Sequence, residues 1–241
     1  MPPQNSGDRS CSCYKVECCG GGEGEVAINS KRPRTTAVCD AETSGRLIEA
    51  GASVLLLEAG PRDRNPLVHI PAGFTRLLST DLLYHYETEP QTGLDSRPRI
   101  VPQGRVLGGG SSVNALIYIR GQQEDYDEWA RLGNSGWSYD EVLPYFKRAE
   151  DNERLDDRYH GVGGPLGVSD LSQRCELSTA FVRAAQQAGI PFTHDFNGAR
   201  QNGDGFNQIT TRDKRRCSAA VAYLRNAEAS AEIARLEPGV V

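Results

Sequence analysis

Residues 104–114 read Gly-Arg-Val-Leu-Gly-Gly-Gly-Ser-Ser-Val-Asn. Three consecutive glycines followed by two serines favour neither a helix nor a strand. Glycines allow a backbone to approach a ligand closely, and exposed N–H groups together with hydroxyls suit a pyrophosphate. A glycine run on its own is more often a linker than a binding site, so the surrounding residues must decide between these two interpretations.

The stretch continues in a regular way on its C-terminal side. It runs on as Ala-Leu-Ile-Tyr-Ile-Arg-Gly and ends in Asp-Tyr-Asp-Glu-Trp at residues 125–129. As a whole, residues 104–127 resemble the N-terminal signature of the glucose–methanol–choline (GMC) family of flavin oxidoreductases. The spacing agrees at Asn114, Tyr118 and Gly121, and further landmarks extend the resemblance over residues 46–224.

The resemblance implies a fold, a cofactor and a reaction. The fold is α/β, a partial FAD-binding, Rossmann-like domain with part of a substrate domain. The cofactor is FAD, and the reaction is the choline dehydrogenase-like oxidation of an alcohol CH–OH group with hydride transfer to flavin N5. The partners are a small-molecule alcohol and an electron acceptor that the sequence does not identify. The cofactor-binding residues implied within the signature are Arg105, Gly108, Gly109, Gly110, Ser111, Ser112, Val113, Asn114 and Ala115.

Residue 113 bears on how the flavin is held. Some members of the family attach FAD covalently through a histidine one residue before the asparagine that matches Asn114. Here Val113 occupies that position, and valine has no nucleophilic atom. The resemblance therefore implies non-covalent FAD.

A second signal lies upstream at residues 53–58, which read Ser-Val-Leu-Leu-Leu-Glu. A continuous apolar run of this length is typical of a parallel strand buried on both faces. In a dinucleotide-binding βαβ unit, an acid at the end of the second strand hydrogen-bonds the ribose hydroxyls. Glu58 matches that acid in the GMC family, and the alternative is an acid that simply ends a strand.

The glycine fingerprint expected before this strand is missing. Counting back from Glu58, G-x-G-x-x-G should fall near residues 35–40, which read Thr-Thr-Ala-Val-Cys-Asp. A near-match at residues 22–27 lies too far upstream for a spacing of roughly 20–30 residues, and its glutamates would repel a pyrophosphate. We therefore expect residues 1–43 to be an atypical head, disordered or mis-framed. Residues 44–241 are then an incomplete GMC N-terminal region, with about 155–215 contributing to the substrate domain.

Several helices are predicted from caps and periodicity. Ser138 and Glu141 form a capping box, which starts a helix running to about Asn152. An amphipathic pattern predicts a second helix at residues 177–188, closed by Gly189. Residues 62–103 contain five prolines and are predicted to be rich in loops, and a last helix is predicted at residues 219–229.

Composition excludes several classes. With net charge −5 and no large Lys/Arg block, the chain shows no nucleic-acid footprint. Its longest apolar stretch is too short to span a membrane, and its start is not a secretory signal. Seven cysteines, an odd number, argue for a reducing compartment, so a cytoplasmic location is expected. Five of them lie in the first 39 residues, but their spacing fits no common zinc site, and no metal is predicted.

Catalytic residues are not predicted. The family's base is a histidine in a C-terminal half that we expect to be missing here. The histidines present are His69, His85, His160 and His194, and each is interpreted as solvated or structural. Three alternatives stay open: part of an FAD-dependent enzyme, a truncated pseudoenzyme without FAD, and a cysteine-rich module fused to a degenerate domain.

Overall fold

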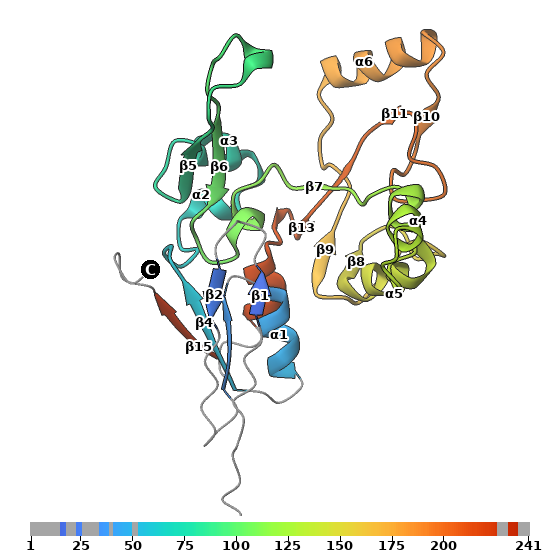
Figure 1. Cartoon of the computed structure of the whole chain (residues 1–241). Helices are drawn as coiled ribbons and strands as arrows, with labels where there is room; N and C mark the ends of the chain where they lie inside the picture. Colours follow the sequence, from blue (N-terminus) through green and yellow to red (C-terminus); the bar gives the residue numbers. More distant parts are fainter. Residues whose placement is uncertain are drawn as a thin grey trace, which may run out of the picture.

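The computed structural model describes residues 41–49 and 53–225, and outside these ranges the backbone of four short strands. It shows two lobes joined by two extended crossings of the chain (Figure 1). The helices are α1 (Ala41–Glu49), α2 (Pro66–His69), α3 (Phe74–Leu77), α4 (Gln123–Arg131), α5 (Tyr139–Ala149) and α6 (Glu176–Gln187). Single turns of 3₁₀ helix are η1 (Pro71–Gly73), η2 (Thr92–Leu94) and η3 (Gly109–Ser112), and η4 (Ala220–Leu224) is a π-helical turn.

Strands in the described parts are short. In the first lobe they are β1 (Lys15–Glu17), β2 (Glu23–Glu25), β3 (Arg34–Val38), β4 (Ser53–Glu58), β5 (Leu83–Glu87), β6 (Ile100–Gly104) and β15 (Ala231–Arg235). In the second lobe and the crossings they are β7 (Ile117–Tyr118), β8 (Glu150–Asn152), β9 (Leu166–Val168), β10 (Phe192–Thr193), β11 (Asp204–Gly205), β12 (Gln208–Ile209), β13 (Thr211–Arg212) and β14 (Arg215–Arg216).

A parallel sheet anchors the first lobe. Its order is β15-β4-β3, and both neighbours run parallel to β4. Val54 and Leu56 are buried, as an inner strand requires, and Leu56 joins a core cluster with Leu107 and Leu224. The prediction of a central buried strand at residues 53–58, and with it the α/β fold, is confirmed.

The missing glycine fingerprint coincides with a strand. β3 occupies residues 34–38, and α1 follows it at Ala41, so the β3–α1–β4 segment has βαβ order. Residues 39–40 lie outside the described part. The near-match at residues 22–27 contains β2, which pairs antiparallel with β1. The described part of that segment is therefore one arm of a hairpin. The predicted disorder of residues 1–43 falls mostly on residues outside the described part.

The loop-rich region has a small core of its own. Short helices α2 and α3 and the hairpin β5–β6 make up most of residues 66–104. Buried side chains from all of them meet side chains that follow β6 in the chain. These buried residues are Val68, Leu77, Leu82, Leu83, Val106 and Val113. The hairpin contributes Leu83 to this core and ends at Gly104. The core therefore holds the first residue of the glycine-rich stretch in place.

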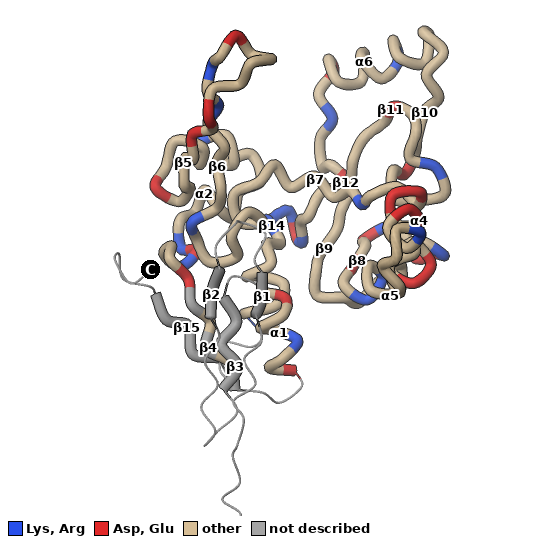
Figure 2. The backbone as a smooth tube through the Cα atoms, in the orientation of Figure 1, with Lys and Arg blue, Asp and Glu red and all other residues tan. Residues whose placement is uncertain are grey.

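The second lobe combines α4, α5 and α6 with short strands. Glu141 accepts hydrogen bonds from the N–H and hydroxyl of Ser138, which confirms the predicted start of α5. The helix ends at Ala149, and the residues predicted to continue it form β8. The prediction of a helix at 177–188 is confirmed by α6, which Gly189 closes at φ 88°. Acidic residues gather on α4, as Figure 2 shows.

Candidate cofactor site

Residues 104–114, here called the glycine loop, leave β6 and turn sharply at two glycines. Gly108 has φ 87° and Gly109 has φ 55°, both in the left-handed region that favours glycine. A Cβ on Gly108 would lie 2.5 Å from the Ser112 Oγ and 3.0 Å from the Ala220 Cβ. The sequence therefore needs glycine at position 108 for both conformation and space.

The outer side of this turn is open. A Cβ placed on Gly109 or on Gly110 would meet no heavy atom within 4 Å. The backbone of these two residues is therefore accessible from that side, as a loop that receives a phosphate must be. On this observation the glycine loop fits a dinucleotide cofactor.

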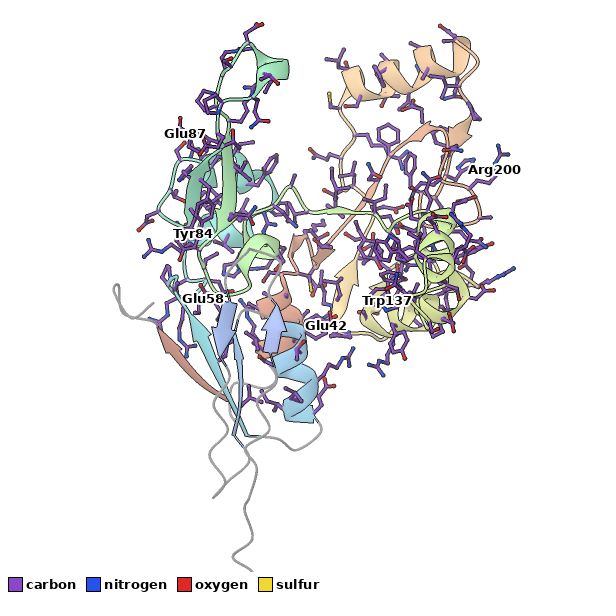
Figure 3. All side chains as sticks on the ribbon, viewed as in Figure 1. Glu42, Glu58, Tyr84, Glu87, Trp137 and Arg200 are labelled. Carbon is purple, nitrogen blue, oxygen red and sulfur yellow. The ribbon has the colours of Figure 1, made fainter. Side chains whose placement is uncertain are left out.

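Glu58 lies where β4 ends, next to the glycine loop. The two segments touch through backbone: a Cβ on Gly60 would lie 2.1 Å from the Arg105 carbonyl oxygen, and the Leu107 N–H donates to the Pro61 carbonyl at 3.0 Å. Figure 3 shows Glu58 at the end of β4 and Tyr84 on β5 in the same lobe. The structure thus brings together the two segments that are predicted to bind the cofactor and that lie about 50 residues apart in the sequence.

The Glu58 carboxylate is half-buried and shaped by its own turn. Its Oε1 accepts a hydrogen bond from the Gly60 N–H at 2.7 Å. Burial raises the pKa of Glu58 above its ordinary value, although the N–H groups of Gly60 and Ala59 and the charge of Arg105 oppose the rise. A partly desolvated acceptor at a strand end is well suited to hydroxyl donors from a ribose.

Arg105 offers an unused donor beside this acid. Its guanidinium lies 5.5 Å from the centre of the Tyr84 ring. Its Nε is buried and has no hydrogen-bond partner among the described residues. Buried donors are nearly always paired in folded proteins, so this atom is a second observation that fits a bound polar ligand here.

The serines and Asn114 hold the loop in shape. The Ser111 hydroxyl donates to the Gly108 carbonyl at 2.6 Å and accepts from the Ala219 N–H at 2.9 Å. Ser112 is fully buried and donates to the Leu107 carbonyl at 2.7 Å. The Oδ1 of Asn114 accepts from the Leu116 N–H at 3.0 Å. Since these groups have partners within the protein, their contact with a ligand stays a prediction.

Val113 and Ala115 are placed differently from the loop's polar residues. Val113 is buried in the core beneath the hairpin, whereas Ala115 is exposed at one end of an apolar cavity of about 540 Å³. Neither side chain can form a polar contact. Their assignment to the cofactor site also stays a prediction.

A buried charge cluster in the second lobe was not predicted. It consists of Arg120, Glu150, His160 and Asp195. His160 is fully buried, with its Nδ1 2.9 Å from Glu150 Oε1 and its Nε2 2.9 Å from Asp195 Oδ2. Arg120 donates to Glu150 Oε2 at 2.7 Å. The cluster ties β8 to the chain before α4 and to the segment after β10.

Protonation of the cluster follows from this geometry. Burial alone would lower the pKa of His160, but its hydrogen bonds with Asp195 and Glu150 outweigh burial and raise the pKa to about 9. The pKa values of Glu150 and Asp195 are both lowered, because the hydrogen bonds they accept outweigh the burial that would raise them. His160 is therefore a cation at neutral pH. A histidine in this state cannot accept a proton, which agrees with a structural interpretation of His160, and its role stays a prediction.

The other histidines, which all lie within the described ranges, form no hydrogen bond with this cluster and have different neighbours. His69 Nε2 lies 2.6 Å from the Asp63 carbonyl, and His85 Nε2 lies 2.9 Å from the Leu78 carbonyl. His194 is exposed and packs edge-on against Phe192. Among the described residues, no group of His, Cys, Asp and Glu is arranged to hold a metal ion. No helix in that part of the chain is long and apolar enough to cross a membrane.

Comparison with known proteins identifies the family of the chain. The GMC oxidoreductase family model matches residues 10–236. An alcohol dehydrogenase [acceptor] of Pseudomonas putida is 46% identical over 175 residues, which are 72% of this chain and 32% of the relative. The mitochondrial choline dehydrogenase of Homo sapiens is 46% identical over 193 residues, 76% of this chain and 32% of the relative. The chain spans about a third of the length of these curated relatives.

Solved structures with a similar fold superimpose on most of this chain. Pyridoxine 4-oxidase from Mesorbium loti superimposes with a TM-score of 0.79 at 31% identity, covering 83% of this chain and 41% of that one. An FAD-dependent oxidoreductase from Chaetomium thermophilum gives a TM-score of 0.73 at 27% identity, covering 83% and 38%. The similarity therefore extends over most of the described residues of both lobes.

Proposed function

Because the chain belongs to the GMC oxidoreductase family, whose members are FAD-dependent, we propose that it is the FAD-binding, N-terminal portion of an alcohol oxidoreductase similar to choline dehydrogenase. The observation that carries the proposal is the contact between the end of β4 and the glycine loop. It joins an acid suited to a ribose with an open glycine turn suited to a diphosphate.

Each part of this site has a role in the proposal. Glu58 accepts hydrogen bonds from the ribose hydroxyls of the adenosine. The backbone at Gly109 and Gly110 faces the diphosphate, and Arg105 supplies a donor beside it. Since Val113 has no nucleophilic atom, FAD is held without a covalent bond.

When bound, FAD supplies the hydride acceptor for oxidation of an alcohol. The residues described here bind and orient it and, through the core beneath the hairpin, exclude water from one side. Proton removal from the alcohol needs a base, and His160 cannot serve because it is already a cation. We place the base in the C-terminal part that the relatives possess beyond the matched region. The alcohol, the electron acceptor and a cytoplasmic location stay predictions.

A second candidate is a pseudoenzyme that binds no FAD. The observation favouring it is that residues 34–40 contain no glycine where a phosphate-binding turn is expected between β3 and α1. That turn would place helix N–H groups on the pyrophosphate, and its loss weakens binding. FAD binding separates the two candidates.

The experiment is a titration of FAD with the purified chain, followed by quenching of flavin fluorescence. Saturable quenching is expected for the wild type. Glu58→Gln should weaken the affinity about tenfold or more, because hydrogen bonds to a charged group contribute about 1.5–3 kcal/mol. Glu87→Gln is the matched control, since Glu87 is exposed on β5. Absence of quenching by the wild type would favour the pseudoenzyme, and equal affinities for the wild type and Glu58→Gln would exclude the ribose role of Glu58.

A further inference from the structure

Arg216 on β14 is buried directly behind the glycine loop. Its side chain is 1% exposed in spite of its charge. Three of its hydrogen bonds go to the loop: to the Ser111 carbonyl at 3.1 Å, to the Asn114 Oδ1 at 2.7 Å and to the Asn114 carbonyl at 2.8 Å. A fourth goes to the Val68 carbonyl on α2 at 2.7 Å. One guanidinium therefore fixes the C-terminal half of the loop to the lobe's core.

The residues that follow Arg216 complete this support. The Ala219 N–H donates to the Ser111 Oγ at 2.9 Å, and Ala220 limits the space beside Gly108. These contacts join positions more than a hundred residues apart in the chain. The segment from Arg216 to Ala220 therefore packs against the glycine loop at Gly108, Ser111 and Asn114.

No acid neutralises Arg216. All four of its acceptors are neutral oxygens, and within the described part of the chain no carboxylate forms an ion pair with it. Burial is the one cause that lowers its pKa, to about 10, so it is charged at neutral pH. Arg120, which is also buried, has Glu150 at 2.7 Å. Buried charges are normally paired, and an unpaired one is costly.

We propose that Arg216 is the positioning residue of the glycine loop, and that its missing counter-charge is the diphosphate of the ligand bound on the loop's open side. A neutral side chain of similar size could fill the space, but it could not bind four carbonyl oxygens or favour an anion. The inference rests on the proposed function for the identity of the ligand. The positioning role depends only on contacts within the chain.

The positioning role is tested without ligand, by amide hydrogen exchange in Arg216→Met, Arg216→Lys and the control Arg215→Met. Arg215 is the exposed neighbour on the same strand. Arg216→Met should speed exchange in residues 104–116 about tenfold or more, since three loop carbonyl oxygens lose their donor. Residues 123–150 should be unchanged. Arg216→Lys, the milder change, should give a smaller increase confined to the same segment, because lysine keeps the charge but lacks the planar fork.

The counter-charge is tested by comparing FAD with riboflavin, which has no phosphate. Arg216→Met should lose about tenfold or more in FAD affinity and much less in riboflavin affinity, whereas Arg216→Lys should keep most of the FAD affinity. A merely structural role would weaken both ligands equally, and that result would overturn the counter-charge.

The positioning role is overturned if exchange in residues 104–116 is unchanged in Arg216→Met, or if exchange rises equally in both lobes. If Arg216→Met fails to fold, the positioning role is decided by hydrogen exchange in Arg216→Lys, again compared between residues 104–116 and the second lobe. If the wild type binds no FAD, the proposed function and the counter-charge both fail, and the exchange result still decides the positioning role.

Discussion

Removing the charge of His160 should abolish a distinct pH dependence of folding stability. The histidine is fully buried between Glu150 and Asp195, each at 2.9 Å. These partners raise its pKa from 6.5 to about 9. A group whose pKa is raised in the folded state stabilises the protein fully below its unfolded pKa, and this stabilisation is lost as the pH rises through the folded pKa. The window for His160 is therefore about pH 6.5 to 9.

The magnitude follows from the same two values. At about 1.4 kcal/mol for each pH unit, the rise from 6.5 to about 9 corresponds to about 3 kcal/mol of stability below pH 6. About 2 kcal/mol should remain at pH 7.5, and almost none above pH 9.5. At the acid end the lowered pKa values of Glu150 and Asp195 act in the opposite sense, since their stabilisation is lost as the pH falls through them.

The assay is urea unfolding of the wild type and His160→Gln at half-unit steps between pH 6 and 9.5, followed by circular dichroism. His160→Gln should lower the free energy of unfolding by about 3–5 kcal/mol at pH 6.5, because Asp195 and Glu150 lose a buried cation. The variant should lack the decline seen in the wild type between pH 7 and 9. His194→Gln is the control, as His194 is exposed, and it should keep that decline.

The reasoning is refuted if the wild type and His160→Gln show the same slope of stability against pH between pH 7 and 9. It is also refuted if the wild type becomes more stable across that interval. Either result would mean that His160 is neutral in the folded protein at pH 7.

Three further substitutions test the glycine loop and the core. Gly108→Ala should destabilise the first lobe by about 2 kcal/mol or more in urea unfolding, because φ is 87° and the new Cβ would lie 2.5 Å from the Ser112 Oγ. Gly109→Ala shares the left-handed φ but meets nothing within 4 Å, so it should cost only about 1–2 kcal/mol, and equal losses for the two would contradict the steric argument. Leu56→Ala should lower the free energy of unfolding by about 2–5 kcal/mol, since Leu56 is 3% exposed within its cluster. A loss below about 1 kcal/mol would show that β4 is not the inner strand of a packed sheet.

Much of the fold could be predicted from short stretches of the sequence. The apolar run at residues 53–58 and the capping box at Ser138 are determined by residues close together in the chain, and both predictions agree with the structure. The glycine loop and Glu58 could be paired because a family signature fixes their spacing. The end of α5 was placed too late because residues 150–152 form β8, which pairs parallel to β9 across a long loop. A helix pattern cannot reveal that competition.

The partners of Arg216 and of the charge cluster could not be predicted from local sequence patterns. His160 was expected to be solvated or structural, but its partners could not be predicted, because they lie 10 and 35 residues away and Arg120 lies 30 residues before Glu150. Arg216 lies within the stretch that resembles the family, yet its role depends on acceptors 102 to 148 residues earlier in the chain. The two arginines differ in one respect that only the structure reveals. Arg120 has a carboxylate and belongs to a neutralised core, whereas Arg216 has neutral oxygens only. An arginine neutralised inside the fold contributes to stability alone, while one left without a counter-ion also favours an anion from outside. This difference supports the proposal that the first lobe, and not the lobe with more buried charge, binds the dinucleotide.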